Sequence, residues 1–271
     1  MTSNAFDHKM ELWLEHQTAP WSRLLYGISH AYLARHLSGL GSNLRVLDAG
    51  GGNGLDAILL AQQGHRVTVL DSSAEMLAEA QRGAKVAGVA HQIEFCHAPL
   101  IDLPRLFPEQ QFDAVLCHSV AHYVKDAVAL LIALGAPLRE RGLLSLISIN
   151  RYSEAFRAAV MWQDLDAALG ILDAETTHSA LFDTSIELRT AGEFVEWLSS
   201  MGFRVLGQYG IRCVNDYIAD NEIKSDPGFF AQLMRLEIEL GSRFPYYLLA
   251  RHFQIVAQKG NVPSQSLRDD P

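Results

Sequence analysis

Three features are scarce in this 271-residue chain: cysteine, long apolar runs and clustered positive charge. The three cysteines, Cys96, Cys117 and Cys213, are widely spaced and form no Cys-x-x-Cys pattern, which argues against a zinc or dithiol motif and predicts reduced core thiols. The longest apolar runs, at 127–138 and 143–149, are shorter than the roughly 20 residues that a membrane helix needs. The net charge of −9, with no long basic block, argues against non-specific nucleic-acid binding.

The amino terminus also lacks the pattern of a secretory signal, because no basic segment precedes an apolar one. With 49% hydrophobic and 20% charged residues, the composition is that of an ordinary globular protein. We therefore expect a soluble, cytoplasmic protein without a metal site or a membrane partner. The sequence offers no basis for assigning an oligomeric state.

One stretch near the start of the chain predicts a ligand-binding turn. A strand-like run over residues 44–48 ends in Asp48, and a helical pattern begins at Leu55. The loop between them contains four glycines: Gly50, Gly51, Gly52 and Gly54. Glycine permits positive φ and close approach to backbone N–H groups, and the following helix adds the positive end of its dipole. The stretch therefore predicts strand, tight turn and helix around a polar, partly anionic small molecule.

Strand-like and helical segments alternate along the chain, which indicates parallel βαβ units with helices on both faces of a sheet. We predict a Rossmann-like α/β fold with a mostly parallel, seven-stranded sheet. The predicted strands are 44–48, 66–70, 92–97, 112–117, 143–149, 203–208 and 247–257. The predicted helices include one that begins near Pro20 and others at 55–63, 74–88, 127–138, 191–201 and 229–240.

The alternation is interrupted after residue 150, where we expect a helix at 155–172 and an irregular polar stretch at 173–184 that together form a lid. The predicted organisation has five segments. They are an N-terminal helical segment over the cofactor site (1–43), a cofactor-binding core (44–150), a lid or acceptor insertion (151–190), the C-terminal part of the same domain (191–260) and a tail (261–271).

The register of the glycine loop discriminates between two nucleotide-like ligands. A dinucleotide-binding G-x-G-x-x-G motif needs a small residue where Leu55 stands, so an NAD oxidoreductase is disfavoured. An acidic residue followed by x-G-x-G-x-G is instead the pattern of class I S-adenosylmethionine (SAM) methyltransferases. Here that pattern reads Asp48, Gly50, Gly52 and Gly54.

Three further positions follow predicted strands at the same edge of the sheet, where α/β folds bind ligands. Asp71 ends the second strand, and its carboxylate can accept two hydrogen bonds from a ribose diol. Residues 98–102 follow the third strand and can flank an adenine. His118 ends the fourth strand, where the methionine moiety of SAM and the methyl acceptor would meet.

Several motifs resemble the bacterial tRNA 5-carboxymethoxyuridine methyltransferase family over most of the chain. They lie at 46–52, 71–76, 112–120, 210–217 and 236–252. The resemblance implies SAM as cofactor, S-adenosylhomocysteine as product and a tRNA wobble carboxymethoxyuridine as acceptor. It also implies that Arg23 binds the carboxylate of the methionine moiety, Asp71 the ribose, and Leu100 and Ile101 the adenine. The complete expected cofactor set is Arg23, Asp48, Gly50, Gly51, Gly52, Asp71, Ser72, Met76, Leu100, Ile101 and His118.

The acceptor remains open between this tRNA and a small molecule. The family carries a lysine-rich cluster where residues 171–183 of this chain contain no Lys or Arg and are acidic. A carboxylate acceptor needs no general base, and Arg151, Arg212 and Arg251 are candidates to hold it. An amine or hydroxyl acceptor needs one, and His118, His122 and Tyr123 are the catalytic candidates. The alternative is a catalytically silent, SAM-binding regulatory protein.

Overall fold

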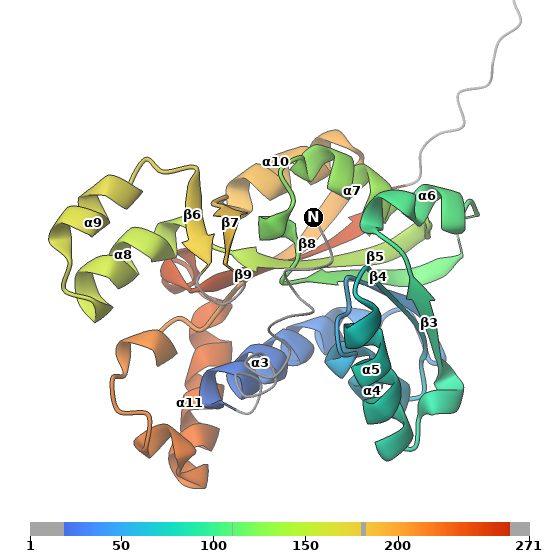
Figure 1. Cartoon of the computed structure of the whole chain (residues 1–271), viewed down its shortest axis with the longest axis horizontal. Coiled ribbons are helices and arrows are strands. Elements are labelled where there is room, and N and C mark those ends of the chain that lie inside the picture. The colour runs from blue at the N-terminus through green and yellow to red at the C-terminus, as the bar shows by residue number, and fades with distance from the viewer. Residues whose placement is uncertain (1–18, 110, 180–182, 261–271) are drawn as a thin grey trace, which may run out of the picture.

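A computed structural model describes residues 19–109, 111–179 and 183–260 of the chain. Residues 1–18 and the predicted tail at 261–271 lie outside these ranges. Within them, the predicted seven-stranded, mostly parallel sheet is confirmed (Figure 1). Its strands lie in the order β3 (Ile93–His97), β2 (Arg66–Asp71), β1 (Arg45–Ala49), β4 (Phe112–His118), β5 (Leu138–Ile149), β9 (His252–Lys259) and β8 (Phe203–Ile211).

Strand direction brings distant parts of the chain to one edge of this sheet. β1 to β5 are parallel, whereas β9 is antiparallel to both β5 and β8. Because β9 runs in the opposite direction, its first residue His252 pairs with the last residues of its neighbours, Ile149 of β5 and Ile211 of β8. The carboxyl ends of six strands and the amino end of β9 therefore share the edge where α/β sheets bind ligands.

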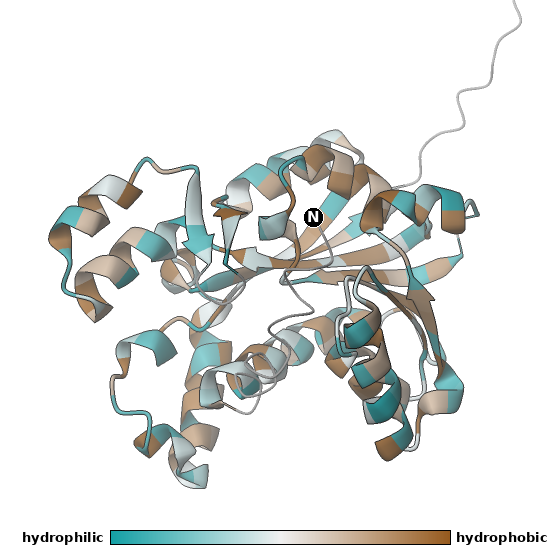
Figure 2. Ribbon diagram, in the orientation of Figure 1, coloured by the Kyte–Doolittle hydropathy of each residue, from teal (hydrophilic) through white to brown (hydrophobic). Residues whose placement is uncertain are grey.

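Helices cover both faces of the sheet, as predicted (Figure 1). One face packs against α6 (Leu103–Leu106), α7 (Ala127–Gly135) and α10 (Ala191–Ser200). The other face packs against α3 (Pro20–Leu37), α4 (Leu55–Gln62) and α5 (Ala74–Val86), and α11 (Pro227–Gly241) packs against α3. Apolar side chains concentrate on the strands (Figure 2), as expected for a sheet buried on both faces. No helix in the described ranges is long and apolar enough to cross a membrane.

The segment after β5 differs from the expected single helix and irregular stretch. Two helices, α8 (Arg151–Met161) and α9 (Leu165–Ile171), replace the predicted helix at 155–172 and extend away from the sheet (Figure 1). The break occurs because Gln163 has a φ of 54° and the Asp164 side chain accepts the N–H of Ala167, which caps a new helix. The stretch predicted to be irregular contains β6 (Thr176–Ser179), which forms an antiparallel hairpin with β7 (Thr184–Glu187) at its end.

Several other boundaries differ from prediction, and β5 begins at Leu138 and not at 143. α7 ends at Gly135 and not at 138, because Pro137 cannot supply a helical N–H and its carbonyl accepts the N–H groups of Gln111 and Phe112. The last strand begins at His252, because residues Tyr246–Leu249 form a short 3₁₀ turn, η6. The other 3₁₀ turns are η1 (Ala90–Gln92), η2 (Leu100–Asp102), η3 (Ala121–Tyr123), η4 (Asn215–Tyr217) and η5 (Ile223–Ser225).

Candidate functional site

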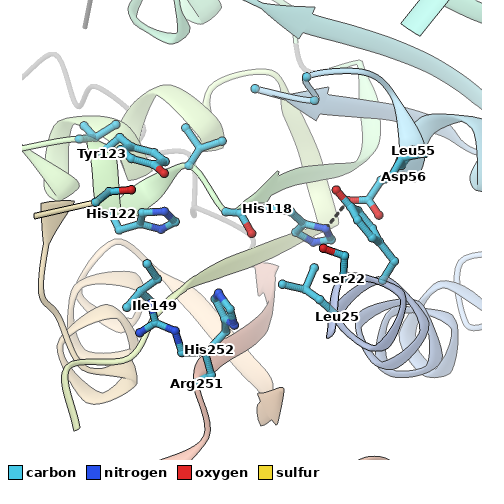
Figure 3. A pocket seen from close by; sticks show the side chains of 18 of the residues that line it. Ser22, Leu25, Leu55, Asp56, His118, His122, Tyr123, Ile149, Arg251 and His252 are labelled. Carbon is cyan, nitrogen blue, oxygen red and sulfur yellow. Dashed lines mark hydrogen bonds and ion pairs between the residues drawn. The ribbon is translucent and has the colours of Figure 1, made fainter. Parts of the chain in front are cut away.

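A cavity of about 1030 Å³ lies at the shared edge of the sheet. One side, the glycine-loop side, is formed by the loop after β1 and the ends of β2, β3 and β4. The other side, the arginine wall, is formed by Arg157 of α8, Arg212 after β8 and Arg251 before β9. Figure 3 shows side chains from both sides converging on the same space. The cavity therefore joins the predicted ligand loop to residues more than a hundred positions later in the chain.

The glycine loop forms the tight turn predicted from sequence. Gly50 has a φ of 78°, and a Cβ atom there would lie 2.7 Å from Val120 Cγ2. A Cβ atom on Gly51 would lie 2.5 Å from the Asp48 carboxylate. Side chains are therefore excluded from the turn, so that backbone forms the cavity surface.

The amide hydrogens of this loop are not free, although the sequence suggested that a ligand would approach them. Gly50 and Gly51 both donate to the carbonyl of Leu70, and Gly52 donates to Asp71 Oδ2 at 2.9 Å. The loop therefore offers a surface without side chains and not a row of unpaired donors.

Asp71 lies at the carboxyl end of β2 and lines the cavity. Its Oδ2 accepts the Gly52 N–H and its Oδ1 accepts the Ser73 N–H, both at 2.9 Å, so it joins the glycine loop to the start of α5. Burial raises the pKa of Asp71, and these backbone hydrogen bonds oppose the shift. A carboxylate has about four acceptor sites, so acceptor sites are left for a ligand. The expected neighbours Ser72, Met76, Leu100 and Ile101 also line the glycine-loop side.

Asp48 is buried beneath the same loop and also lines the cavity. Its Oδ2 has no hydrogen-bond partner within the described ranges. Burial, followed by the charges of Asp56 and Asp71, raises the pKa of Asp48 well above its ordinary value. A buried polar atom without a partner is uncommon, so the site fits a ligand with a hydrogen-bond donor at this point.

His118 lies in the cavity wall, but both of its ring nitrogens are engaged. Nδ1 is 2.7 Å from Asp56 Oδ2, and Nε2 is 2.8 Å from the hydroxyl of Ser145. The other oxygen of Asp56 is 2.7 Å from Nε2 of His30. Burial would raise the pKa of Asp56, but His118 and His30 outweigh it and hold that pKa below its ordinary value. His118 is therefore positioned by its partners and has no free nitrogen to take a proton from an acceptor.

The arginine wall is a continuous chain of ion pairs. Arg251 pairs with Glu154, and Arg157 Nη1 lies 3.6 Å from the same carboxylate. Arg157 also lies 3.3 Å from Asp216, which accepts a 2.8 Å hydrogen bond from Arg212. Burial opposes ionisation of Asp216, but Arg212 and Arg157 hold its pKa below the ordinary value. Three arginines thus share two carboxylates, which leaves a positive charge facing the cavity.

The backbone at Arg212, within the arginine wall, has an uncommon conformation. Arg212 has a φ of 65°, which a non-glycine side chain seldom adopts, and its carbonyl accepts the N–H of Arg251 at 3.0 Å. Burial lowers the pKa of Arg251 to about 10, so its guanidinium stays charged at neutral pH. Two of the three predicted acceptor-binding arginines, Arg212 and Arg251, are therefore brought together.

His122 and Tyr123 lie beside the arginine wall (Figure 3) but are poor proton acceptors at neutral pH. Burial, followed by the charges of Arg251 and Arg189, lowers the pKa of His122 to about 3. Burial raises the pKa of Tyr123 to about 12, against a hydrogen bond with Ser179. His122 therefore binds a second proton too weakly to act as a general base. Tyr123 keeps its hydroxyl proton at neutral pH.

Two expected site residues lie away from the cavity. The Arg23 guanidinium stacks over the Phe230 ring at 4.3 Å and is exposed, whereas Ser22 and Leu25 of the same helix line the cavity. Arg151 donates from Nε and Nη2 to the Leu188 carbonyl, at 3.0 and 2.6 Å, beside a separate groove between α8 and α9. Each residue points to a neighbouring element because of its angle on its own helix.

Sequence reasoning missed six charged residues that line the cavity: Asp56, Lys125, Asp126, Arg157, Asp216 and Lys224. Asp56 resembled an ordinary acidic residue in the first turn of a helix. A signal existed for Asp216, because Arg212 and Asp216 stand four residues apart in the motif at 210–217. Arg157 and Lys224 carry no local signal, since only folding brings their segments to the cavity.

Comparisons with known proteins agree with the geometry of the glycine-loop side. Residues 46–142 match the family model described as "Methyltransferase domain". The tRNA 5-carboxymethoxyuridine methyltransferase of Escherichia coli K12 is 29% identical over 249 residues, covering 88% of this chain and 93% of that protein. A ubiquinone biosynthesis O-methyltransferase of Xanthomonas axonopodis is 33% identical over 176 residues, covering 63% of this chain and 70% of that protein.

A solved structure shares the fold. Magnesium protoporphyrin IX methyltransferase from Synechocystis, determined with bound S-adenosylhomocysteine, matches with a TM-score of 0.59 and 17% identity, over 89% of this chain and 86% of that one. This match shows the fold. The family model, the relatives and the acidic-x-G-x-G-x-G turn assign the cofactor. The chain belongs to the class I SAM-dependent methyltransferases, with SAM as its methyl donor.

Proposed function

We propose that this enzyme methylates a carboxylate oxygen of an acidic acceptor held against the arginine wall. The observation that carries the proposal is the excess of positive charge there, in a cavity where His118, His122 and Tyr123 are all unsuited to take a proton. A carboxylate is already ionised at neutral pH, so its reaction needs charge complementarity and positioning but no base.

The glycine-loop side supplies the proposed cofactor contacts. Asp71 accepts hydrogen bonds from the ribose hydroxyls, and Leu100 and Ile101 cover the adenine. The turn at Gly50–Gly52 gives the methionine moiety close access to backbone, and Asp48 Oδ2 accepts a hydrogen bond from it. SAM, when bound, supplies an electrophilic methyl group on a sulfonium.

The arginine wall orients the acceptor in this proposal. Arg251 and Arg212 bind the carboxylate through guanidinium N–H groups, whose fork matches two oxygens. The carboxylate oxygen forms the new O–C bond as the S–C bond breaks, and the bonding pair returns to sulfur. No proton is transferred, and the products are a methyl ester and S-adenosylhomocysteine.

Two acidic acceptors fit the proposal. The Escherichia coli relative supports a carboxymethoxyuridine in tRNA. The acidic segment at 171–183 disfavours a phosphate backbone near the hairpin and supports a small organic acid. Nothing in the comparisons supports a catalytically silent protein.

The test is an acceptor screen that measures S-adenosylhomocysteine release. It compares tRNA bearing carboxymethoxyuridine with small carboxylic acids and with amines and alcohols of matched skeleton. We expect products only from carboxylates, and we expect those products to be esters that mild base hydrolyses. Turnover of amines or alcohols in preference to the acids would refute the proposal, because it would require a base that the cavity does not provide.

A further inference from the structure

We propose that Lys224 forms a second anion-binding subsite, so that the acceptor carries another acidic group besides the carboxylate that is methylated. This inference rests on the proposed carboxyl methylation and specifies its substrate class. The predicted ligand is a small acid with two anionic groups, called a dianion, whose second group is a carboxylate or a phosphate.

The position of Lys224 is unusual for a lysine. It lies in the short turn η5, is only 3% exposed, and lines the cavity on the same side as Arg212. Its Nζ donates to Asn221 Oδ1 at 3.0 Å, and the described ranges show no second hydrogen bond for this group. An ammonium has three protons to donate, so a buried lysine with one neutral partner is set up to receive an anion.

The charge balance of the wall points the same way. Arg157, Arg212 and Arg251 share two carboxylates, Glu154 and Asp216, whereas the charges that act on Lys224 are those of Asp216, Arg212 and Asp220. Both carboxylates already pair with arginines, and neither forms an ion pair with Lys224. No described carboxylate lies within ion-pair distance of Lys224, so a second acidic group on the acceptor would be its first direct counter-ion.

An unsatisfied neighbour supports a ligand at this end of the cavity. Asn215 is 1% exposed, and its Oδ1 has no hydrogen-bond partner within the described ranges, although its Nδ2 donates to Asp216. Asn215 and Asn221 both line the cavity with Lys224. The subsite thus combines an ammonium donor with an amide oxygen that has no donor, which a hydroxyl group on the acid would supply.

The test measures binding of matched acids to full-length protein saturated with S-adenosylhomocysteine. The probes are hexanoate, adipate and 6-(phosphonooxy)hexanoate, titrated by calorimetry. We expect one of the two dianions to bind at least about tenfold more tightly than hexanoate, as a charge-assisted contact allows. Whether adipate or the phosphate ester binds more tightly identifies the second group.

Variants separate a ligand contact from a structural role. We define the dianion preference as the ratio of dianion affinity to hexanoate affinity. Lys224→Met should reduce this ratio to about one, and Lys224→Arg should retain much of it. Lys85→Met, on the exposed face of α5, is the control and should leave the preference unchanged. The subsite is overturned if the dianion preference survives Lys224→Met. It is also overturned if the wild-type protein shows no such preference, and failure of all three acids to bind counts as no preference.

The same samples distinguish this inference from the proposed function. Dianions that bind through Lys224 without releasing S-adenosylhomocysteine in the presence of SAM would support the subsite and contradict carboxyl methylation. Hexanoate that is esterified as well as adipate would support carboxyl methylation and contradict the subsite.

Discussion

Asp71 shows how one residue can serve both the cofactor and the loop that surrounds it. Its carboxylate fixes the N–H groups of Gly52 and Ser73, and we propose that the same oxygens accept the ribose hydroxyls. We predict that Asp71→Ala weakens SAM binding by at least about 100-fold, since two charge-assisted hydrogen bonds are lost. Calorimetric titration with SAM measures the effect.

The matched control is Asp71→Asn, which keeps one oxygen and the shape of the side chain. We expect it to weaken SAM binding by only about tenfold. Unchanged SAM affinity in Asp71→Ala would contradict the ribose assignment.

Arg251 illustrates the cost of an unpaired buried charge. Its side chain is largely buried beside Glu154, whose other cation, Arg157, is 3.6 Å away. We predict that Arg251→Met lowers the free energy of unfolding by about 3 kcal/mol, because Glu154 loses its nearer partner. Urea unfolding of the single variant and of Arg251→Met/Glu154→Gln tests this, since the second change should restore part of the loss. A double variant less stable than the single one would contradict it.

At the residue scale, the sequence predicted the cofactor side better than the acceptor side. The glycine spacing and Asp71 are local signals, because a strand end and its loop lie together in sequence. Arg23 and Arg151 stand on helices that contribute other residues to the cavity, α3 and α8, but neither arginine lines it. Their side chains turn to Phe230 and Leu188, and sequence alone does not specify a helix's rotation against a partner two hundred residues away.

At the element scale, one helix sets the shape of the arginine wall. Glu237 of α11 is fully buried, and its carboxylate accepts the N–H groups of Cys213, Val214 and Asn215. These residues follow Arg212 in the loop that leaves β8. Burial raises the pKa of Glu237, and the three hydrogen bonds oppose that shift. The helix thereby fixes the loop that presents Arg212 and Asp216 to the cavity.

We predict that Glu237→Ala destabilises the protein by about 3 kcal/mol or more, because three buried N–H groups lose their acceptor. Glu237→Gln keeps one oxygen and should cost about half as much. Urea unfolding measures both values, and calorimetry should show SAM affinity within about twofold of wild type, since Glu237 does not line the cavity. Equal stability of Glu237→Ala and wild type would contradict this role for α11.

Helices and strands were predictable where the apolar pattern is strong. Their ends were not predictable where side-chain hydrogen bonds determine them. The break between α8 and α9 depends on the Asp164 cap and on Gln163 in a left-handed conformation. The hairpin of β6 and β7 has a polar, half-exposed sequence without the alternation that marks a strand.

At the scale of the whole molecule, buried neutral histidines make stability depend on pH. His122 has a pKa of about 3 in the folded protein against an ordinary value of 6.5. The unfolded chain therefore binds a proton below pH 6.5 that the folded protein refuses until about pH 3. The contribution of neutral His122 to the free energy of unfolding is complete above pH 6.5. It is lost as the pH falls from 6.5 towards 3.

For His122 alone, the loss between pH 7 and pH 5 is about 2 kcal/mol. Other groups titrate in the same range, and Asp48, with its raised pKa, acts in the opposite direction. The measurement is therefore a difference: urea unfolding at both pH values for wild type and for His122→Gln. The variant should lose about 2 kcal/mol less on acidification, and equal losses would contradict the assignment.

The overall fold followed from the sequence because seven strands and their intervening helices repeat one simple pattern. The acceptor side did not, since it depends on where β9 and the α8–α9 insertion are placed by tertiary packing. Only the antiparallel insertion of β9 between β5 and β8 brings Arg251 beside Arg212.

The late position of β9 in the chain also sets the order in which the two sides of the cavity are synthesised. The glycine-loop side is complete at His118, the end of β4, whereas Arg251 comes more than a hundred residues later. At ordinary rates of translation, a ribosome takes on the order of ten seconds to add the residues between them. A nascent chain thus carries its nucleotide-binding turn well before the strand that completes the anion-binding wall, so acceptor capture is the last capability to emerge.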